Sequence, residues 1–149
     1  MTITIRQADI NDLPIIYSNE LAYILEIEPT EEEVWKNAIP KLLTQWITNL
    51  SRMFIAEENN KPIGHFFWQI DGEMALLSSI YLLPKSRRKG YGRLLLERFE
   101  NDAFTKGFTH LKLGVYKTNS ANILYRELGY QIVTTDNHYN YYNKFIVKE

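Results

Sequence analysis

The segment at residues 82–93 contains the residues best suited to chemistry, because it combines permissive backbone with positive charge. Gly90 and Gly92 lie two residues apart, between an apolar strand-like run and a segment of helical periodicity. Glycines permit close backbone approach, and a helix that starts there presents unpaired N–H groups and its positive dipole end. Five cationic side chains lie within nine residues: Lys85, Arg87, Arg88, Lys89 and Arg93. The combination predicts a cradle for a polyphosphate ligand.

Two familiar phosphate loops do not fit this segment. The Gly-x-x-x-x-Gly-Lys-Ser/Thr pattern of P-loop enzymes is absent, and a dinucleotide-binding loop would need a glycine where Leu95 stands. The remaining alternative is an ordinary basic turn before a surface helix. A lone Gly-x-Gly would favour that alternative, whereas the strand on one side and the helix on the other favour the cradle.

Hydrophobic periodicity predicts the elements that must position this loop, in one α+β domain over residues 1–149. Helical spacing recurs before residue 52, and again before and after the strand pattern at residues 111–116. Pro29 ends the first helix, Thr30 and Glu33 form a possible capping box for the second, and Pro40 predicts a bend or break. Strand patterns cover residues 1–6, 53–57, 63–70, 74–83, 111–116, 130–134 and 139–147.

Composition excludes several classes of protein. The chain has 149 residues and no cysteine, which excludes disulfides, thiolate zinc sites and a cysteine nucleophile. A net charge of −1 argues against a nucleic-acid partner. Apolar runs are too short to span a membrane, and the N-terminus lacks a signal-peptide pattern, so we expect a cytoplasmic protein without a membrane partner. No histidine or carboxylate grouping has metal-ligand spacing, so no metal is expected.

Two separated motifs resemble those of one enzyme superfamily. Residues 87–92, Arg-Arg-Lys-Gly-Tyr-Gly, match the signature Arg/Gln-x-x-Gly-x-Gly/Ala, and residues 121–130 match Ala-x-x-x-Tyr-x-x-x-Gly-Phe/Tyr. Both are similar to the GNAT N-acetyltransferase superfamily, and the similarity extends over residues 74–132. It implies an α+β fold with a mixed, mostly antiparallel central sheet of about seven strands, flanked by about four helices. It also implies an acetyl-CoA-dependent N-acetyltransferase.

The resemblance assigns the coenzyme to the loop and to the strand before it. The pantetheine arm would pair with the backbone of Tyr81, Leu82 and Leu83. In this family a bulge in the same strand splays it from the next one and admits the thioester. Asn119 would stand in for an asparagine that members carry one position earlier, at Thr118 here. Arg87 would be among the cations that complement the coenzyme's phosphates. The pyrophosphate itself would lie on the backbone N–H groups of six residues: Arg88, Lys89, Gly90, Tyr91, Gly92 and Arg93.

The resemblance also assigns catalytic roles. The amine attacks the thioester directly, and a backbone N–H near Leu82 stabilises the developing oxyanion. Tyr125 corresponds to the tyrosine that protonates the departing thiolate, for which a phenol with a reference pKa of about 10 is suited. Tyr125 could instead only pack its helix on the sheet. Glu73 is the best-placed general-base candidate, followed by Asp71 and His65. A polar hairpin tip is nevertheless the favoured explanation of Glu73 and Asp71, and a structural role explains His65 at least as well.

The acceptor is an unidentified amine, of a small molecule or of a peptide. Carboxylates before residue 34 could attract it, or could simply form a solvated helix face: Glu20, Glu26, Glu28 and Glu31–Glu33. Aromatic residues could line its slot, although core packing and strand propensity explain most of them: Tyr17, Tyr23, Trp35, Trp46, Phe67, Trp68, His138, Tyr139, Tyr141 and Tyr142.

Two other functions fit parts of the sequence. A catalytically silent acyl-CoA sensor would keep the loop but occlude the acceptor slot. An RNA-binding module would use the basic loop and exposed aromatic residues, against which the charge balance argues. The aromatic C-terminal strand could also pair across a homodimer.

Overall fold

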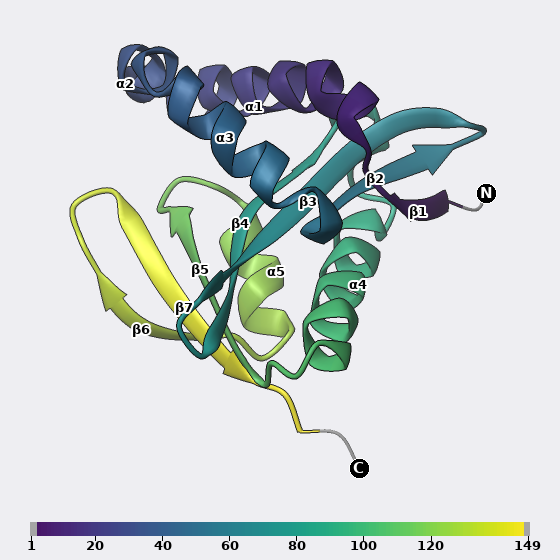
Figure 1. Ribbon diagram of the computed structural model, residues 1–149. Coiled ribbons are helices and arrows are strands. Elements are labelled where there is room, and N and C mark those ends of the chain that lie inside the picture. Colours follow the sequence, from purple (N-terminus) through teal and green to yellow (C-terminus); the bar gives the residue numbers. More distant parts are fainter. Residues whose placement is uncertain (1–2, 148–149) are drawn as a thin grey trace.

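A central sheet organises the structure, a computed structural model that describes residues 3–147 (Figure 1). Its strands are β1 (Ile3–Gln7), β2 (Met53–Glu58), β3 (Lys61–Asp71), β4 (Met74–Leu82), β5 (His110–Tyr116), β6 (Gln131–Thr135) and β7 (Tyr139–Phe145). The helices are α1 (Leu13–Ile27), α2 (Glu32–Asn37), α3 (Ile39–Thr48), α4 (Tyr91–Thr105) and α5 (Ala121–Glu127). Met1 and Thr2 of the predicted first strand lie outside the described residues.

The sheet has seven strands in the order β1-β2-β3-β4-β5-β7-β6. All neighbours are antiparallel except β4 and β5, which are parallel because α4 crosses between them. The mixed, mostly antiparallel sheet expected from the sequence is therefore confirmed.

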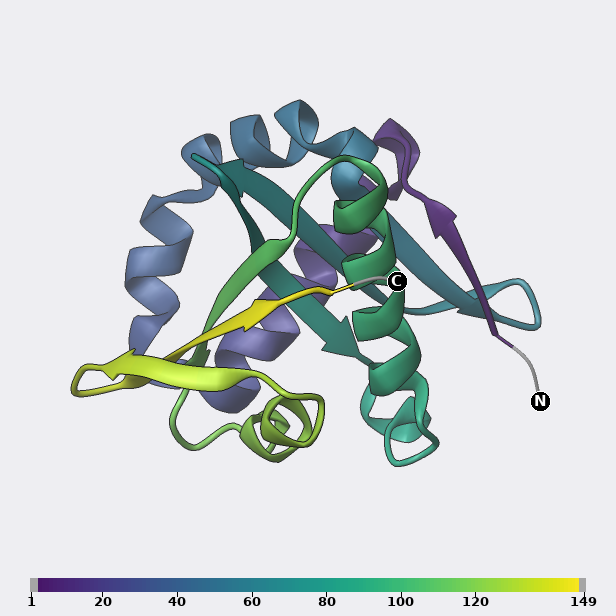
Figure 2. The ribbon, with the colours of Figure 1, turned by 90° about the horizontal axis from the view of Figure 1, so that it is seen from below.

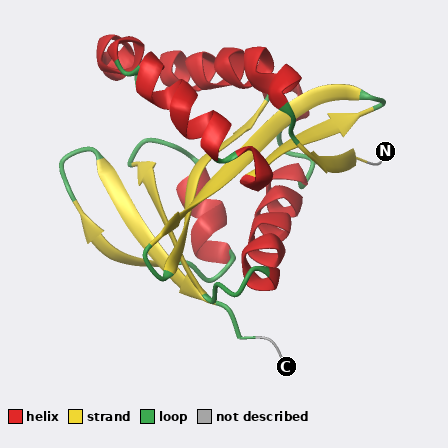
Figure 3. Ribbon diagram, viewed as in Figure 1, coloured by secondary structure: helices red, strands yellow, loops and turns green. Residues whose placement is uncertain are grey.

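Helices cover both faces of the sheet. One face packs against α4 and α5, and its core includes Trp68, Leu95 and Phe99. The other face packs against α1, α2 and α3, where Ile16, Trp46 and Phe67 are buried. Figure 1 shows these two layers edge-on, and Figure 2, seen from below, has α4 and α5 in front of the sheet. Figure 3 shows the same arrangement by element type.

The structure of the N-terminal helices tests two predictions, the capping box at Thr30 and the break at Pro40. Pro29 begins a single turn of 3₁₀ helix, Pro29–Glu31, so that Thr30 lies inside the turn and no side chain caps α2. The predicted capping box is therefore wrong, because proline at the first position of a turn starts the turn too early for it. The predicted break at Pro40 is confirmed: it separates α2 from α3, so that five α-helices flank the sheet within residues 3–147, in line with the expected number of about four.

Strands β4 and β5 run together only at their beginnings. They pair through Ala75, Leu76 and Leu77, and not beyond. On the other side of β4, Phe67 pairs with Ser79 and Trp68 with Leu77, which leaves Ser78 as a bulge without a partner on β3. A bulge bends its strand and increases its twist. The second half of β4 therefore diverges from β5, and among the described residues no strand lies beside its edge (Figure 2).

Candidate active site

The segment between β4 and α4 forms the loop expected to hold phosphates. Arg88 and Gly90 have positive φ angles of 62° and 83°, and Gly90 is the N-cap of α4. The Leu94 N–H bonds to the Gly90 carbonyl, whereas within residues 3–147 no chain group accepts from the backbone N–H groups of residues 88–93. Unpaired N–H groups at the positive end of a 15-residue helix favour an anion there.

The Arg87 side chain forms its hydrogen bonds within the protein. Its Nε donates to the Leu82 carbonyl at 2.9 Å, and its two terminal nitrogens donate to both oxygens of Glu26 at 2.6 and 2.8 Å. Its guanidinium also lies 5.3 Å from the Tyr81 ring centroid. The ion pair raises the pKa of Arg87 and lowers that of Glu26. Arg87 thus ties the loop to β4 and α1, while Lys85, Arg88, Lys89 and Arg93 are exposed.

The register of β4 with β3 determines which backbone groups of β4 face its open edge. The Leu83 N–H donates to the Ile63 carbonyl at 2.8 Å, so the alternation of an antiparallel pair directs Tyr81 toward β3 as well. Ile80 and Leu82, which alternate with these two residues, direct their N–H and C=O groups to the open side. Of the three residues expected to pair with pantetheine, only Leu82 has backbone groups on the open side. Ile80, which was not expected, has them there too.

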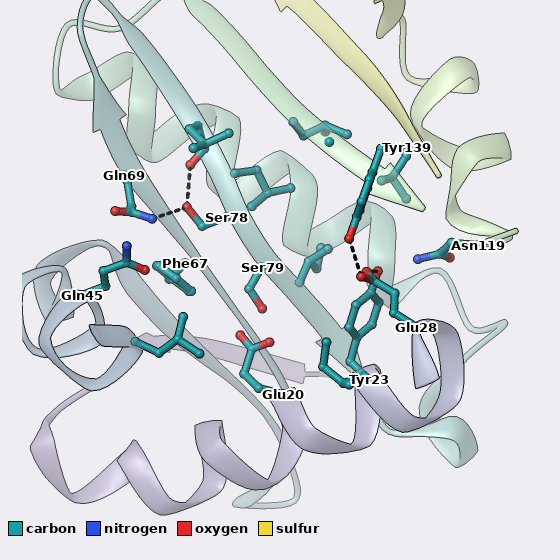
Figure 4. A pocket seen from close by; sticks show the side chains of 18 of the residues that line it. Glu20, Tyr23, Glu28, Gln45, Phe67, Gln69, Ser78, Ser79, Asn119 and Tyr139 are labelled. Atoms are coloured by element: carbon teal, nitrogen blue, oxygen red, sulfur yellow. Dashed lines mark hydrogen bonds between the residues drawn. The ribbon is translucent and has the colours of Figure 1, made fainter. Parts of the chain in front are cut away.

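A cavity of about 430 Å³ lies beside this open edge (Figure 4). Helices α1, α2 and α3 supply one wall, and β3, β4 and β5 supply the other. Its polar or aromatic lining residues include Glu20, Tyr23, Glu28, Trp35, Gln45, Trp46, Phe67, Gln69, Ser78, Ser79, Asn119, Tyr125 and Tyr139. The cavity thus joins the second half of β4 to side chains that could handle an amine.

Tyr125 projects from α5 into this region and is 4% exposed. Its ring contacts those of Tyr130 and Tyr142, with centroid distances of 5.8 and 5.9 Å. Burial raises the pKa of the Tyr125 hydroxyl, and Tyr142 adds to the effect. The hydroxyl is therefore a neutral proton donor at physiological pH, as its expected role requires.

Glu28 is a buried carboxylate between two tyrosines. Tyr23 donates to Oε2 at 2.7 Å and Tyr139 donates to Oε1 at 2.5 Å (Figure 4). Burial and the Glu28 carboxylate together raise the pKa of both hydroxyls. The three side chains bring a fixed negative charge from the end of α1 into the cavity, which favours a cationic ligand.

A second carboxylate, Glu20, lies beside β4 (Figure 4). His65 Nε2 is 3.4 Å from Glu20 Oε1 and 3.1 Å from Ser79 Oγ, and both of these partners line the cavity. From the sequence alone, Glu20 is among the carboxylates that could attract the acceptor, with a solvated helix face as the alternative, but it is not a general-base candidate. Nothing in its spacing marks it as a site residue, because the helix face that meets β4 is set by packing.

The structure does not bring Glu73 into this constellation. Glu73 is exposed at the turn between β3 and β4, and Asp71 forms an ion pair with Lys112. Neither lines the cavity. The turn is at the far end of β4 from the glycine loop, so a base there would have to act from outside the cavity.

Asn119 lines the cavity and also starts α5, because its Oδ1 accepts from the Ala121 N–H at 2.9 Å. The buried amide of Asn122 supports the same loop by donating to the carbonyls of Tyr116 and Asn119. Sequence reasoning missed Asn122, although an asparagine inside a short apolar helix is a signal for such a role.

Among the aromatic candidates, Trp68 and Tyr142 belong to the core. Trp68 donates to Asp102, and Tyr142 donates to Asn122. Tyr141 donates to Asp136 at the surface, so Tyr139 is the tyrosine of β7 that reaches the cavity. Within residues 3–147, no grouping of three or more histidine or carboxylate side chains could hold a metal ion. No helix of that range has the length and apolar character to cross a membrane.

Comparison with known proteins yields a family match. The model of the family described as "Acetyltransferase (GNAT) family" matches residues 20–130. The [ribosomal protein bS18]-alanine N-acetyltransferase of Haemophilus influenzae is 38% identical over 87 residues, and the match spans 58% of each protein. A peptidyl-lysine N-acetyltransferase of Escherichia coli is 28% identical over 131 residues, which is 87% of this chain and 84% of that protein.

Among solved structures, the PaiA N-acetyltransferase from Thermoplasma acidophilum, crystallised in complex with coenzyme A, has a similar fold. The TM-score is 0.82 at 23% identity, and the alignment covers 98% of this chain and 100% of that one. At this identity, the likeness establishes the fold and leaves the acceptor open.

Proposed function

We propose that this chain, which belongs to the acetyltransferase (GNAT) family, transfers an acetyl group from acetyl-CoA to a primary amine of a peptide or protein. The family match confirms the resemblance drawn from the glycine loop and the Tyr125 motif. The observation that carries the proposal is the continuous path from the N–H groups of residues 88–93 along the open edge of β4 to the cavity. The two curated relatives are named for a ribosomal-protein alanine and a peptidyl lysine as acceptors.

The chain fits the coenzyme at two positions. The unpaired N–H groups of residues 88–93 would bind its pyrophosphate, helped by the exposed cations beside them. The outward N–H groups of Ile80 and Leu82 and the outward Ile80 carbonyl would bind the pantetheine arm as they would bind an added strand, while the Leu82 carbonyl accepts from Arg87. When bound, acetyl-CoA supplies the activated acetyl thioester.

The residues around the cavity would assist direct attack by a neutral amine. The outward backbone N–H near Leu82 would stabilise negative charge on the acetyl oxygen. Tyr125 would donate its proton to the departing sulfur, and burial keeps that proton in place until it is needed. A cavity open beside this tyrosine favours turnover over the silent acyl-CoA sensor, which an occluded slot would have favoured.

We assign proton removal from the incoming ammonium to Glu20 rather than Glu73. Glu20 lines the cavity beside Ser79, whereas Glu73 is exposed at a turn outside it. Glu28 also lines the cavity, but both of its oxygens already accept from tyrosine hydroxyls. Its role is to attract the cationic acceptor into the site.

Binding of the coenzyme is the first test. Acetyl-CoA at about 100 times its dissociation constant should stabilise the folded protein by about 2.7 kcal/mol, measured by thermal unfolding. ATP at the same concentration is the control. Gly92→Val should abolish the stabilisation, because its methyl groups would cover the loop N–H groups, while its Cβ meets only the flexible ends of Leu124 and Leu82, at 3.3 and 4.0 Å. A wild-type protein without a shift would contradict the proposal.

The second test identifies the acceptor class with three peptides that differ only in their amino groups. One has a free alanine N-terminus and no lysine, one has a blocked N-terminus and one lysine, and one has neither amine. Release of CoA thiol should occur with a peptide that carries a free amine and not with the doubly blocked peptide. Equal release from all three would indicate hydrolysis instead of amine acetylation.

A further inference from the structure

His65 is a fully buried histidine whose partners converge on the cavity. It lies on β3, has 0% exposure, and pairs in register with Tyr81 of β4. Its Nδ1 is 3.2 Å from Asn19 Nδ2, and its Nε2 faces Ser79 Oγ and Glu20 Oε1 at 3.1 and 3.4 Å. Every polar atom of the ring therefore has a partner, on α1 or on β4.

The hydrogen-bond pattern determines which ring nitrogen carries the proton. A carboxylate only accepts hydrogen bonds, so the nitrogen that faces Glu20 is the donor, Nε2–H. In a neutral imidazole Nδ1 is then an acceptor, and the Asn19 amide donates to it. Asn19, itself 7% exposed, thus orients the ring so that its N–H is directed at Glu20 and Ser79.

This polar cluster occupies an otherwise apolar interface. Phe67, two residues along β3, faces the same helical layer and packs among Ile16, Trp46 and Ile55. Buried polar groups add little net stability even when all are paired, and are costly when one partner is lost. An apolar side chain at position 65 would serve packing alone. The cluster does something packing does not: it holds two side chains of the cavity wall in place.

We propose that His65 is a positioning residue, held in its Nε2–H form by Asn19, that fixes the Glu20 carboxylate and the Ser79 hydroxyl at the acceptor side of the cavity. The inference rests on the proposed function, because Glu20 is assigned there as the group that takes the proton from the amine. His65 has no access to substrate, so its effect on the reaction passes through Glu20.

Three variants separate orientation from packing. In His65→Gln the side-chain amide extends to the position of Nε2 and keeps a donor toward Glu20, whereas in His65→Asn it reaches only the position of Nδ1. His65→Leu keeps about the same side-chain volume and removes both polar positions. We expect kcat to fall about 10- to 100-fold in His65→Leu and His65→Asn, part of what a general base contributes, and to be largely retained in His65→Gln. Acetyl-CoA affinity should stay within a factor of about 3 in all three, because His65 touches neither the loop nor the outward groups of β4.

A double-mutant cycle with Glu20→Gln tests the dependence on Glu20. If His65 acts through Glu20, adding His65→Leu to Glu20→Gln should lower kcat little further. Multiplicative losses, or a His65→Gln variant as slow as His65→Leu, would overturn the proposal. So would losses of kcat that simply follow the melting temperatures of the variants.

One measurement does not depend on turnover. The ¹⁵N chemical shifts of the His65 ring in the wild-type protein should report the neutral Nε2–H tautomer, and Asn19→Leu should shift the tautomer balance toward Nδ1–H. An Nδ1–H ring in the wild type would overturn the proposal. Failure of the proposed function would be seen separately, as a wild-type protein that does not bind acetyl-CoA.

Discussion

At the scale of single residues, the tyrosines on and around α5 divide between chemistry and support. Tyr125 lines the cavity, while the hydroxyl of its neighbour Tyr142 donates to Asn122 at 2.7 Å and holds the loop before α5. The two rings are of the same type, are both buried, and lie 5.9 Å apart. They therefore form a matched pair for testing which of them takes part in the reaction.

Tyr125→Phe should lower kcat by about 10²- to 10⁴-fold, the usual contribution of a general acid, with little change in acetyl-CoA affinity. Tyr142→Phe should instead cost about 0.5–1.5 kcal/mol of unfolding free energy, because Asn122 Oδ1 loses one of its two donors and keeps Asn140, and should leave kcat near the wild-type value. Steady-state kinetics, calorimetric binding and urea denaturation distinguish these outcomes. Equal loss of kcat and of affinity in Tyr125→Phe would indicate a packing role.

The same scale shows what could be predicted from the sequence and what could not. Tyr125 lies in a motif of fixed spacing after a strand, so its element and its neighbours followed from the pattern. Glu20 lies on α1 and Glu28 directly follows it, and the charged and apolar residues of this helix leave several faces possible. Which face meets β4 depends on how α1 crosses the sheet, and no local signal encodes that crossing.

At the scale of elements, β4 combines paired and unpaired backbone groups in alternation. Tyr81 and Leu83 bond to β3, and Ile80 and Leu82 face the side that β5 has left. The glycine loop was predictable because its residue types define it. The family resemblance implied a bulge in this strand, but its position at Ser78 was not predictable from the residues, because a single-residue register shift leaves the hydrophobic pattern of β4 almost unchanged.

Amide hydrogen exchange should reveal this alternation directly. Without ligand, the N–H groups of Ile80 and Leu82 should exchange faster than those of Tyr81 and Leu83, which are bonded within the sheet. Saturating acetyl-CoA should slow exchange at Ile80 and Leu82 by at least about tenfold, because the pantetheine arm would accept from them. Protection gained at Tyr81 or Leu83 instead would contradict the register described above. Residue-resolved NMR exchange is the measurement.

The link between α1 and the glycine loop rests on Arg87. Its hydrogen bonds to Glu26 and to the Leu82 carbonyl hold the segment before Arg88, whose backbone has a positive φ angle that non-glycine residues seldom adopt. Arg87→Met should therefore weaken acetyl-CoA binding several-fold by loosening the loop. Glu26→Gln should weaken it less, because Arg87 keeps its bond to Leu82 and the exposed ion pair itself adds little energy. Calorimetric titration checks the order, and a reversed order would show that Glu26 carries the link.

At the scale of the whole molecule, the sheet consists of two parts joined by a short parallel contact. Strands β1 to β4 form one part, and β5, β7 and β6 form the other. The order of elements was predictable because each has its own period and its own ends. The divergence of β4 from β5 followed from the family resemblance alone, since it arises from tertiary packing on both sides of β4 and has no local signal in the sequence. The expected pairing of the C-terminal strands across a dimer stays a prediction, with β6 at the exposed edge.

The stability of the whole fold against acid should depend on Asp12, which joins the first strand to the helical layer. Both oxygens of this buried carboxylate accept from Arg6 at 2.9 Å, and one also accepts from the Asp9 N–H. The Arg6 hydrogen bond lowers the pKa of Asp12. The folded state therefore binds fewer protons, so the stabilisation is complete above the unfolded pKa of about 3.9 and is lost as pH falls toward the folded value.

Asp12→Asn should lower the unfolding free energy by about 1–2 kcal/mol at pH 7, at the modest end for charged hydrogen bonds because Arg6 is partly exposed. Asp9→Asn is the matched control: it removes the same charge three residues away, but asparagine caps the first turn as well as aspartate does. Urea denaturation between pH 7 and pH 3 should find the Asp12→Asn deficit shrinking below about pH 4, as wild-type Asp12 becomes protonated. A deficit that stays constant across this range would mean that Asp12 stabilises the fold through its shape and neutral hydrogen bonds, and not through its charge.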